Sequence, residues 1–262
     1  MNNDARVLGA EALASAILMI GGLGTMVLSG SAVGVVGWAL AFGLSFVAVS
    51  HAVGNVSGCH VNPAVTLAMV LTRKLTFARA VFYWIGQVLG AVLGALVVWG
   101  IGRGSDTFHA GHHFAANGWG RWSPGGYGLG SVMIIEIVLT AIWVFVALST
   151  AGRGFSPGAR GVSIGATLVM IQLVSTTVDN GSANPTRSLA AAIFDGSSAL
   201  KQVWVFVLFP LIGTIVAVVA WLAIDPATLE DTMLDSQLTR TIRDAADSVG
   251  DAAIGVVEDV VD

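Results

Sequence analysis

Two Asn-Pro pairs, the second followed by an arginine, are the residues whose types and spacing point most directly to a function. They stand as Asn62-Pro63-Ala64 within HVNPAV and as Asn184-Pro185-Thr186-Arg187 within SANPTR. Asparagine is a strong helix N-cap and proline is favoured at the first helical position, so each pair predicts the start of a short helix. A helix N-terminus carries the positive end of the helix dipole, and an asparagine amide donates hydrogen bonds. Such a place binds the lone pair of a neutral oxygen atom and repels cations, hydronium included.

The elements that must hold these motifs are apolar helices. Of the 262 residues, 55% are hydrophobic and 11% are charged, and the mean hydropathy is +0.81; soluble chains carry about a quarter charged residues. Two apolar pieces, Asn62–Leu71 and Asn184–Phe194, are too short to cross a bilayer and are predicted as half-helices. The sequence thus predicts an all-α integral membrane protein with six crossings, at Val7–Leu28, Val33–Val53, Ala80–Ile101, Leu129–Thr150, Val162–Val178 and Val203–Ile224.

An internal repeat decides how these elements are arranged. Glu11 lies 51 residues before Asn62, and Glu136 lies 48 residues before Asn184. Three crossings per copy is an odd number, so the second copy must be inverted and the half-helices must enter from opposite faces, with their N-termini meeting at the midplane. We therefore predict a channel domain at 1–224, with repeats at about 7–101 and 129–224 joined by the loop 102–128.

Glycine-rich segments precede both half-helices, GNVSGCH at 54–60 and DNGSA at 179–183. Non-helical backbone at membrane depth cannot face lipid and must line a cavity. The carbonyl groups of these segments are therefore predicted to form a row of acceptors along a pore.

These motifs carry a family resemblance. SGCHVNPAV and SANPTRS, together with Glu11 and Glu136, resemble the major intrinsic proteins, the family of aquaporins and glycerol facilitators, over about residues 7–224. NGWGRWSPGGYG at 117–128 and WALAFGLS at 38–45 are similar to the bacterial aquaporin Z type. The resemblance implies homotetramers with one pore per subunit, passive transport without a cofactor, and a selectivity filter near the outer mouth.

The resemblance assigns that filter to Phe42, Gln172, Gly181 and Arg187. Water-selective members typically have a histidine where Gln172 stands and a threonine or cysteine where Gly181 stands. Gln172 keeps a donor and an acceptor, while Gly181 is expected to remove a wall of the filter. The guanidinium of Arg187 supplies hydrogen-bond donors and a positive barrier to cations.

The residue after the arginine separates two functions within the family. Glycerol facilitators usually carry an aspartate there, whereas this chain has Ser188. We therefore predict a water channel with a possible leak of small neutral solutes, and the alternative is an aquaglyceroporin-like channel for glycerol or other uncharged solutes. Thr186 replaces the family's alanine opposite Pro63; it is either a tolerated substitution or the cause of a modest change in single-channel rate.

The other predicted pore residues support the two loops. By resemblance, Glu11 and Glu136 accept hydrogen bonds from the loop backbones. A different class of function, a proton-coupled secondary transporter, would instead use these two acids as coupling groups. The residues expected to line or support the pore are His60, Cys59, Gly58, Asn180, Ser182, Glu11 and Glu136.

Charge placement predicts orientation. Lys and Arg in the short connections favour one side, so both termini are expected to be cytoplasmic in a multi-pass inner (plasma) membrane protein. The basic residues expected on the cytoplasmic side are Arg6, Arg73, Lys74, Arg79, Arg153 and Arg160. Those expected on the other side are Arg103, Arg121 and Lys201. Partners are water, possibly small neutral solutes, and the lipid bilayer.

Three further expectations concern chemistry and the tail. We expect no nucleic acid, no metal and no enzyme activity, and we interpret the H-x-x-H-H loop at 109–113 as solvated rather than metal-binding. Cys59 lies in a predicted pore loop, so mercury labelling is expected to block the pore. The acidic tail at 225–262 is either an amphipathic helix or a mobile solvated segment.

Overall fold

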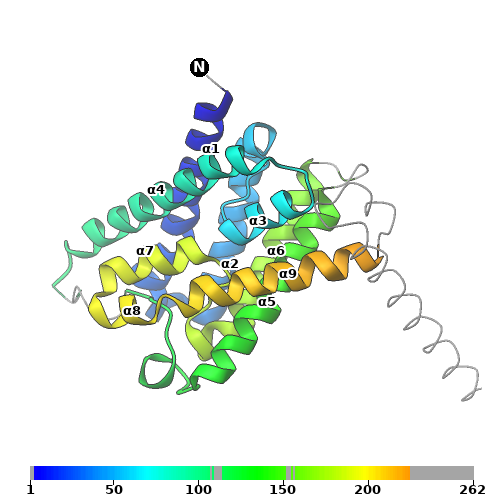
Figure 1. Cartoon of the computed structure of the whole chain (residues 1–262). Coiled ribbons are helices and arrows are strands. Elements are labelled where there is room, and N and C mark those ends of the chain that lie inside the picture. Colours follow the sequence, from blue (N-terminus) through cyan, green and yellow to red (C-terminus); the bar gives the residue numbers. More distant parts are fainter. Residues whose placement is uncertain (1–2, 107, 109–113, 152–154, 156, 225–262) are drawn as a thin grey trace, which may run out of the picture.

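The computed structural model describes the chain except for residues 1–2, 107, 109–113, 152–154, 156 and 225–262, so the predicted tail helix and the histidine loop lie outside the described residues. All elements among the described residues are helical (Figure 1). In chain order they are α1 (Asn3–Leu18), a π-helical turn (Met19–Leu23), α2 (Gly24–Ser57), α3 (Pro63–Leu71), α4 (Phe77–Gly102), a 3-10 turn (Gly120–Trp122), α5 (Leu129–Thr150), α6 (Pro157–Asp179), α7 (Pro185–Asp195), α8 (Ser197–Gln202) and α9 (Val205–Ile224).

The first long apolar segment makes two crossings. Five segments in the described part are long and apolar enough to span a membrane, and the first of them runs from Asn3 to Ser57. Its 55 residues would extend roughly 80 Å as one straight helix, whereas a bilayer core is about 30 Å thick. The segment breaks at Gly34, whose φ of 63° and ψ of −173° are not helical. The five segments therefore contain the six predicted crossings, and α3 and α7 are the two half-helices.

Two helix pairs of the repeat pack closely through glycine. On α4, a Cβ atom added at Gly90 would lie 2.0 Å from the carbonyl oxygen of Ala12 on α1. On α9, a Cβ added at Gly213 would lie 2.4 Å from the carbonyl oxygen of Ile137 on α5. The first pair belongs to one repeat and the second pair to the other, so both copies bring their outer helices together in the same way.

The π-helical turn in the first crossing has a consequence for the predicted filter. A Cβ added at Gly22 would lie 2.1 Å from the ring of Phe42 on α2. Only a glycine leaves room for this aromatic ring, which is 1% exposed. Gly22 of this turn therefore provides the space that the Phe42 ring occupies.

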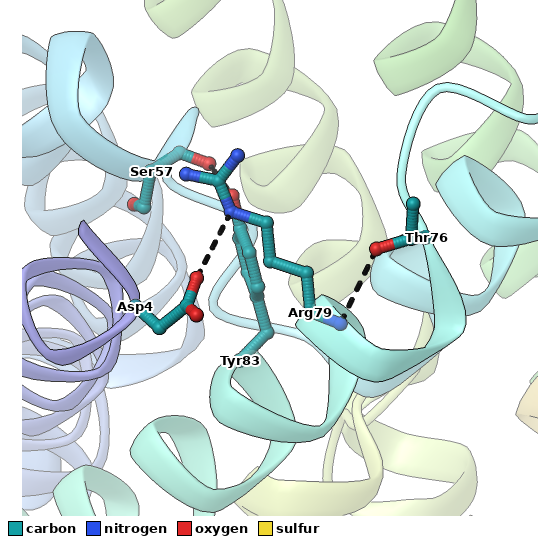
Figure 2. A network of polar contacts seen from close by, with 5 residues as sticks. All are labelled: Asp4, Ser57, Thr76, Arg79 and Tyr83. Carbon is teal, nitrogen blue, oxygen red and sulfur yellow. Dashed lines mark hydrogen bonds and ion pairs between the residues drawn. The ribbon is translucent and has the colours of Figure 1, made fainter. Parts of the chain in front are cut away.

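Polar contacts close one end of the bundle (Figure 2). Arg79 Nε of α4 lies 3.7 Å from Asp4 Oδ1 of α1, and the Arg79 backbone N–H donates to the capping hydroxyl of Thr76 at 3.4 Å. One turn further along α4, the Tyr83 hydroxyl donates to the Ser57 carbonyl at 2.7 Å. These contacts join α1, α4 and the start of the first pore loop.

Element boundaries differ from prediction at α2 and α6. Helix α2 continues to Ser57, so residues 54–57 of the first predicted loop are helical and the non-helical backbone begins at Gly58. Helix α6 begins at Pro157, five residues before the predicted start at Val162. Proline is favoured in the first helical turn, and the residues Gly158 to Gly161 that follow it continue the helix beyond the apolar stretch. Arg160, expected in a connection, consequently lies within α6.

Candidate functional site

The two asparagines of the Asn-Pro pairs cap the half-helices. The Asn62 side-chain oxygen accepts the backbone N–H of Ala64 at 2.9 Å. The Asn184 oxygen accepts the N–H groups of Thr186 and Arg187 at 3.1 and 3.4 Å. Both half-helices therefore begin where the sequence predicts, and their N-termini carry the positive ends of two dipoles.

The same asparagines join the two loops reciprocally. Asn62 Nδ2 donates to the Ala183 carbonyl at 2.8 Å, and Asn184 Nδ2 donates to the Val61 carbonyl at 2.9 Å. Each amide NH₂ group has two hydrogens, so this exchange leaves one N–H on each asparagine for a solute. The structure brings the two motifs together at one place, as the inverted repeat predicts.

Both loops reach this place through a left-handed backbone. Cys59 and Val61 have φ values of 53° and 47°, and Gly181 and Ala183 have φ values of 67° and 55°. These positions lie three residues and one residue before the capping asparagine in each loop. Left-handed conformations are unfavourable for residues other than glycine, so contacts elsewhere must hold them.

Glu11 supplies such contacts for the first loop. It is 0% exposed, and its carboxylate accepts the backbone N–H groups of His60 and Val61 at 2.9 and 2.8 Å. It also accepts the Ser57 hydroxyl at 2.6 Å and the Gln87 amide at 2.8 Å. All four bonds converge on one buried acid, which thereby fixes the loop.

Glu136 holds the second loop with the help of an acid that the sequence analysis missed. Both Glu136 carboxylate oxygens accept the Ala183 N–H, at 3.1 and 3.2 Å. Asp179 is 0% exposed, accepts the Gly181 N–H at 2.9 Å, and lies close enough to Glu136 for the two acids to interact electrostatically. The sequence does contain a signal for this role, because Asp179 stands directly before Asn-Gly at the end of an apolar crossing.

Arg187 is buried and held in place by several acceptors. Its Nη1 donates to the Ala115 carbonyl and to Asn117 Oδ1, both at 2.7 Å, and its Nη2 donates to the Asn180 carbonyl at 3.0 Å. Nη2 also contacts the Met26 sulfur at 3.5 Å. Met26, Ala115 and Asn180 line a cavity of about 450 Å³. The arginine therefore lies at the base of a vestibule, here called the Arg187 end, rather than extending toward lipid headgroups.

Two of the predicted filter residues, Gln172 and Gly181, compensate for each other in volume. A Cβ added at Gly181 would lie 2.3 Å from Gln172 Oε1. The glutamine carboxamide therefore occupies the space that a side chain at position 181 would fill. The expectation that Gly181 removes a wall thus needs a correction, because Gln172 replaces that wall.

Two of the predicted filter residues carry unsatisfied polar atoms. Gln172 Oε1 and Arg187 Nε are buried and have no hydrogen-bond partner among the described residues. The Arg187 guanidinium lies 5.8 Å from the centre of the Phe42 ring. An unsatisfied acceptor and an unsatisfied donor are groups that a water molecule can satisfy, because water both donates and accepts.

The compensation between Gln172 and Gly181 can be tested by a double-mutant cycle. Gly181→Ala alone should lower water permeability by about fivefold or more, because overpacking costs ~1–3 kcal/mol and the new side chain requires a left-handed backbone. Adding Gln172→Ala removes the clash and should restore most of that loss. Stopped-flow light scattering on proteoliposomes measures all four proteins, and strictly additive effects would contradict the compensation.

Thr186 points its polar group back into the cap. Its hydroxyl donates to Asn184 Oδ1 at 2.8 Å, and the residue borders an apolar cavity shared with Pro63 and Pro185. Thr186→Ala should therefore change water permeability by less than about twofold. The lost hydrogen bond stabilises the helix cap by about 1 kcal/mol, and the Thr186 hydroxyl is not expected to contact passing water. Light scattering on proteoliposomes measures the water permeability, and thermal unfolding in detergent measures the stability. A change in permeability beyond about twofold in protein of normal stability would contradict this expectation.

The remaining predicted pore residues take mainly structural places. His60 stacks on Tyr83 with ring centres 4.6 Å apart, and its Nδ1 lies 3.1 Å from the Thr66 hydroxyl. Gly58 ends α2 with a φ of 82°, and Cys59 is 2% exposed within the core. The Ser182 hydroxyl accepts the Asn184 N–H at 3.3 Å. Mercury labelling of Cys59 consequently requires the loop to open.

Among the described residues, no group of three or more His, Cys, Asp or Glu side chains is arranged to hold a metal ion.

Comparisons with known proteins agree with this geometry. The family model described as "Major intrinsic protein" matches residues 2–221. The chain is 39% identical to Aquaporin Z of Brucella melitensis, over 82% of this chain and 95% of that protein, and 42% identical to Aquaporin Z of Photorhabdus laumondii, over 80% and 94%. The aquaglyceroporin from Plasmodium falciparum superposes with a TM-score of 0.76 at 21% identity, covering 86% of this chain and 98% of that structure.

Proposed function

Since this chain belongs to the major intrinsic protein family, we propose that it is a passive water channel which excludes protons and ions. The observations that carry the proposal are that Gln172 fills the space at Gly181, that the Arg187 guanidinium lies 5.8 Å from the centre of the Phe42 ring, and that Gln172 Oε1 and Arg187 Nε have no hydrogen-bond partner among the described residues. The relatives of about 40% identity are named Aquaporin Z, which agrees with water as the solute.

Water is favoured over glycerol by the narrowness of this filter. The exposed fractions of Phe42, Gln172 and Arg187 are 1%, 1% and 2%. A channel for glycerol needs an opening for a three-carbon chain, and here the carboxamide of Gln172 occupies the place where such an opening would lie. The Plasmodium aquaglyceroporin shares the fold, but its low identity says nothing about the solute.

Proton exclusion follows from the donors at the midplane. A water oxygen that accepts an N–H from both Asn62 and Asn184 must direct its own hydrogens away from them, toward both ends of the pore. A proton wire needs each water to turn in the same sense, so this fixed orientation interrupts it. The two half-helix dipoles and the charge of Arg187 add an electrostatic barrier.

The same geometry speaks against a proton-coupled transporter. The carboxylates of Glu11 and Glu136 are already bound to the loop backbones. A coupling group must exchange protons during a cycle, and exchange at these acids would release the loops that form the site.

Stopped-flow light scattering on proteoliposomes tests the proposal. Shrinkage in an impermeant osmolyte measures water flow, and reswelling in glycerol measures glycerol entry. We expect water flow well above that of protein-free liposomes and glycerol entry at the protein-free rate. Glycerol entry at a rate near that of water would establish the aquaglyceroporin alternative, and flux that depends on a pH gradient would establish the transporter.

The assembly and the orientation are also proposals. We propose a homotetramer in the inner (plasma) membrane with both termini cytoplasmic. Exposed apolar side chains on α1 and α2, among them Leu13, Ile17, Val36 and Leu44, support a face that is covered by lipid or by a neighbouring subunit. Native mass spectrometry tests the assembly, and protease access to the C-terminal tail in inverted vesicles tests the orientation.

A further inference from the structure

A second cavity lies at the other end of the pore from Arg187. It measures about 150 Å³ and is bordered by α2, α5, α6 and the start of the first pore loop, through Phe46, Ser50, Gly58, Thr150, Arg160 and Ile164 among others. Gln172 and Arg160 are 12 residues apart on α6, which corresponds to roughly 18 Å along the helix. This cavity, here called the Arg160 end, is therefore separate from the filter.

Arg160 is an unpaired cation in this cavity. Its Nε is buried and has no hydrogen-bond partner among the described residues, and the described residues that line the cavity include no acid. A Cβ added at Gly58 would lie 3.9 Å from Arg160 Nη1, so the guanidinium reaches the beginning of the pore loop. A half-buried arginine without a protein partner needs water or a solute to satisfy its donors.

Aromatic rings accompany this arginine, as at the filter. Phe46 follows Phe42 by four residues on α2, and residues four apart share a helix face. Its ring packs edge-on against Trp143 of α5, with ring centres 6.4 Å apart. Trp143 is 1% exposed, and its Nε1 has no partner in the described part of the chain. A second arginine thus stands beside apolar walls with unsatisfied donors.

We propose that Arg160, together with Phe46, whose ring packs against Trp143, forms a second constriction that repels cations at the end of the pore opposite Arg187. This inference rests on the proposed water-channel function and extends it. Before it reaches the asparagines, a cation that enters from the Arg160 end meets a positive charge that no acid among the described lining residues neutralises. Water passes, because it can accept hydrogen bonds from the guanidinium. The channel therefore has two positive barriers in series, of which the one at Arg187 is the higher and limits cation leakage in the wild type.

The test compares proton leak in single and double variants. Proteoliposomes containing a pH-sensitive dye and a potassium diffusion potential report proton entry, and the same vesicles report water permeability by light scattering. With two barriers in series, Arg160→Ala alone should leave the proton leak near the wild-type level. In the Arg187→Val background, Arg160→Ala should raise the leak by roughly tenfold more, as expected for removing one unit charge ~5 Å from the path at an effective dielectric constant of about 50, between those of protein and water.

Two further variants distinguish a barrier from a structural role. Arg160→Lys in the Arg187→Val background keeps the charge and should keep the leak at the level of Arg187→Val alone. Arg79→Ala in that background removes a charge from the α4 end near Asp4, outside the cavity, and should also leave the leak unchanged. A leak that is the same in Arg187→Val and the Arg160→Ala double variant, with water flow intact, would overturn the second constriction. Absence of water flow in the wild type would instead overturn the proposed function and the inference with it.

Discussion

Arg187→Val is expected to raise the proton and cation leak by roughly a hundredfold, the effect of removing a unit charge ~5 Å from the path at an effective dielectric constant of about 20. The structure adds a second reason. Glu136 and Asp179 lie buried near the guanidinium and are each influenced by its charge. Without Arg187 these acids lose their positive neighbour, and the site no longer repels cations.

Water permeability should respond far less to the same substitution. Valine removes donors to the Ala115 carbonyl and to Asn117 Oδ1, and water in the enlarged space can replace them. Dye-based proton flux and light scattering on the same vesicles measure both quantities. Arg187→Lys is the matched control, because it keeps the charge and loses only the forked geometry. An unchanged leak in Arg187→Val would show that exclusion resides wholly at the asparagines or at the Arg160 end.

The local features of this fold could be predicted from the sequence because their causes are local. An asparagine followed by proline caps a half-helix wherever it stands, and both half-helices begin at Pro63 and Pro185 as predicted. Crossing lengths follow from apolar runs, and the spacing of Glu11 and Glu136 from the two asparagines revealed the repeat. All of these signals depend on residues close together in the chain.

The features that the sequence analysis missed depend on residues distant in the chain. Gly181 suggested an open wall, but its neighbour in space is Gln172 on the preceding helix. Asp179 could be recognised as a partner of Glu136 only after α5 and α6 were placed side by side. The sequence analysis used Arg160 only as a charge in a connection that indicates orientation. In the structure α6 begins about one turn earlier than predicted, and Arg160 lines a cavity. Side-chain partners across helices are not encoded in periodicity.

Glu11→Ala is expected to destabilise the folded protein by about 3–5 kcal/mol, the range for breaking a buried charged network and leaving its donors unsatisfied. The backbone N–H groups of His60 and Val61 and the amide of Gln87 would all lose their acceptor. None of these donors can turn toward bulk water, because Glu11 is fully buried. The loop would then have no compensation for the left-handed backbone at Cys59 and Val61.

The loss of water flow should exceed what this loss of stability alone explains. At a temperature where most Glu11→Ala protein is still folded, a relaxed first loop would misplace the Val61 carbonyl that binds Asn184. Thermal unfolding in detergent and light scattering on proteoliposomes measure the two effects separately. Asp4→Ala is a control from the same helix, since a partly exposed ion pair contributes at most about 1 kcal/mol. Normal water flow in folded Glu11→Ala protein would mean that the reciprocal asparagine bonds alone position the loop, and Glu11 would then serve stability only.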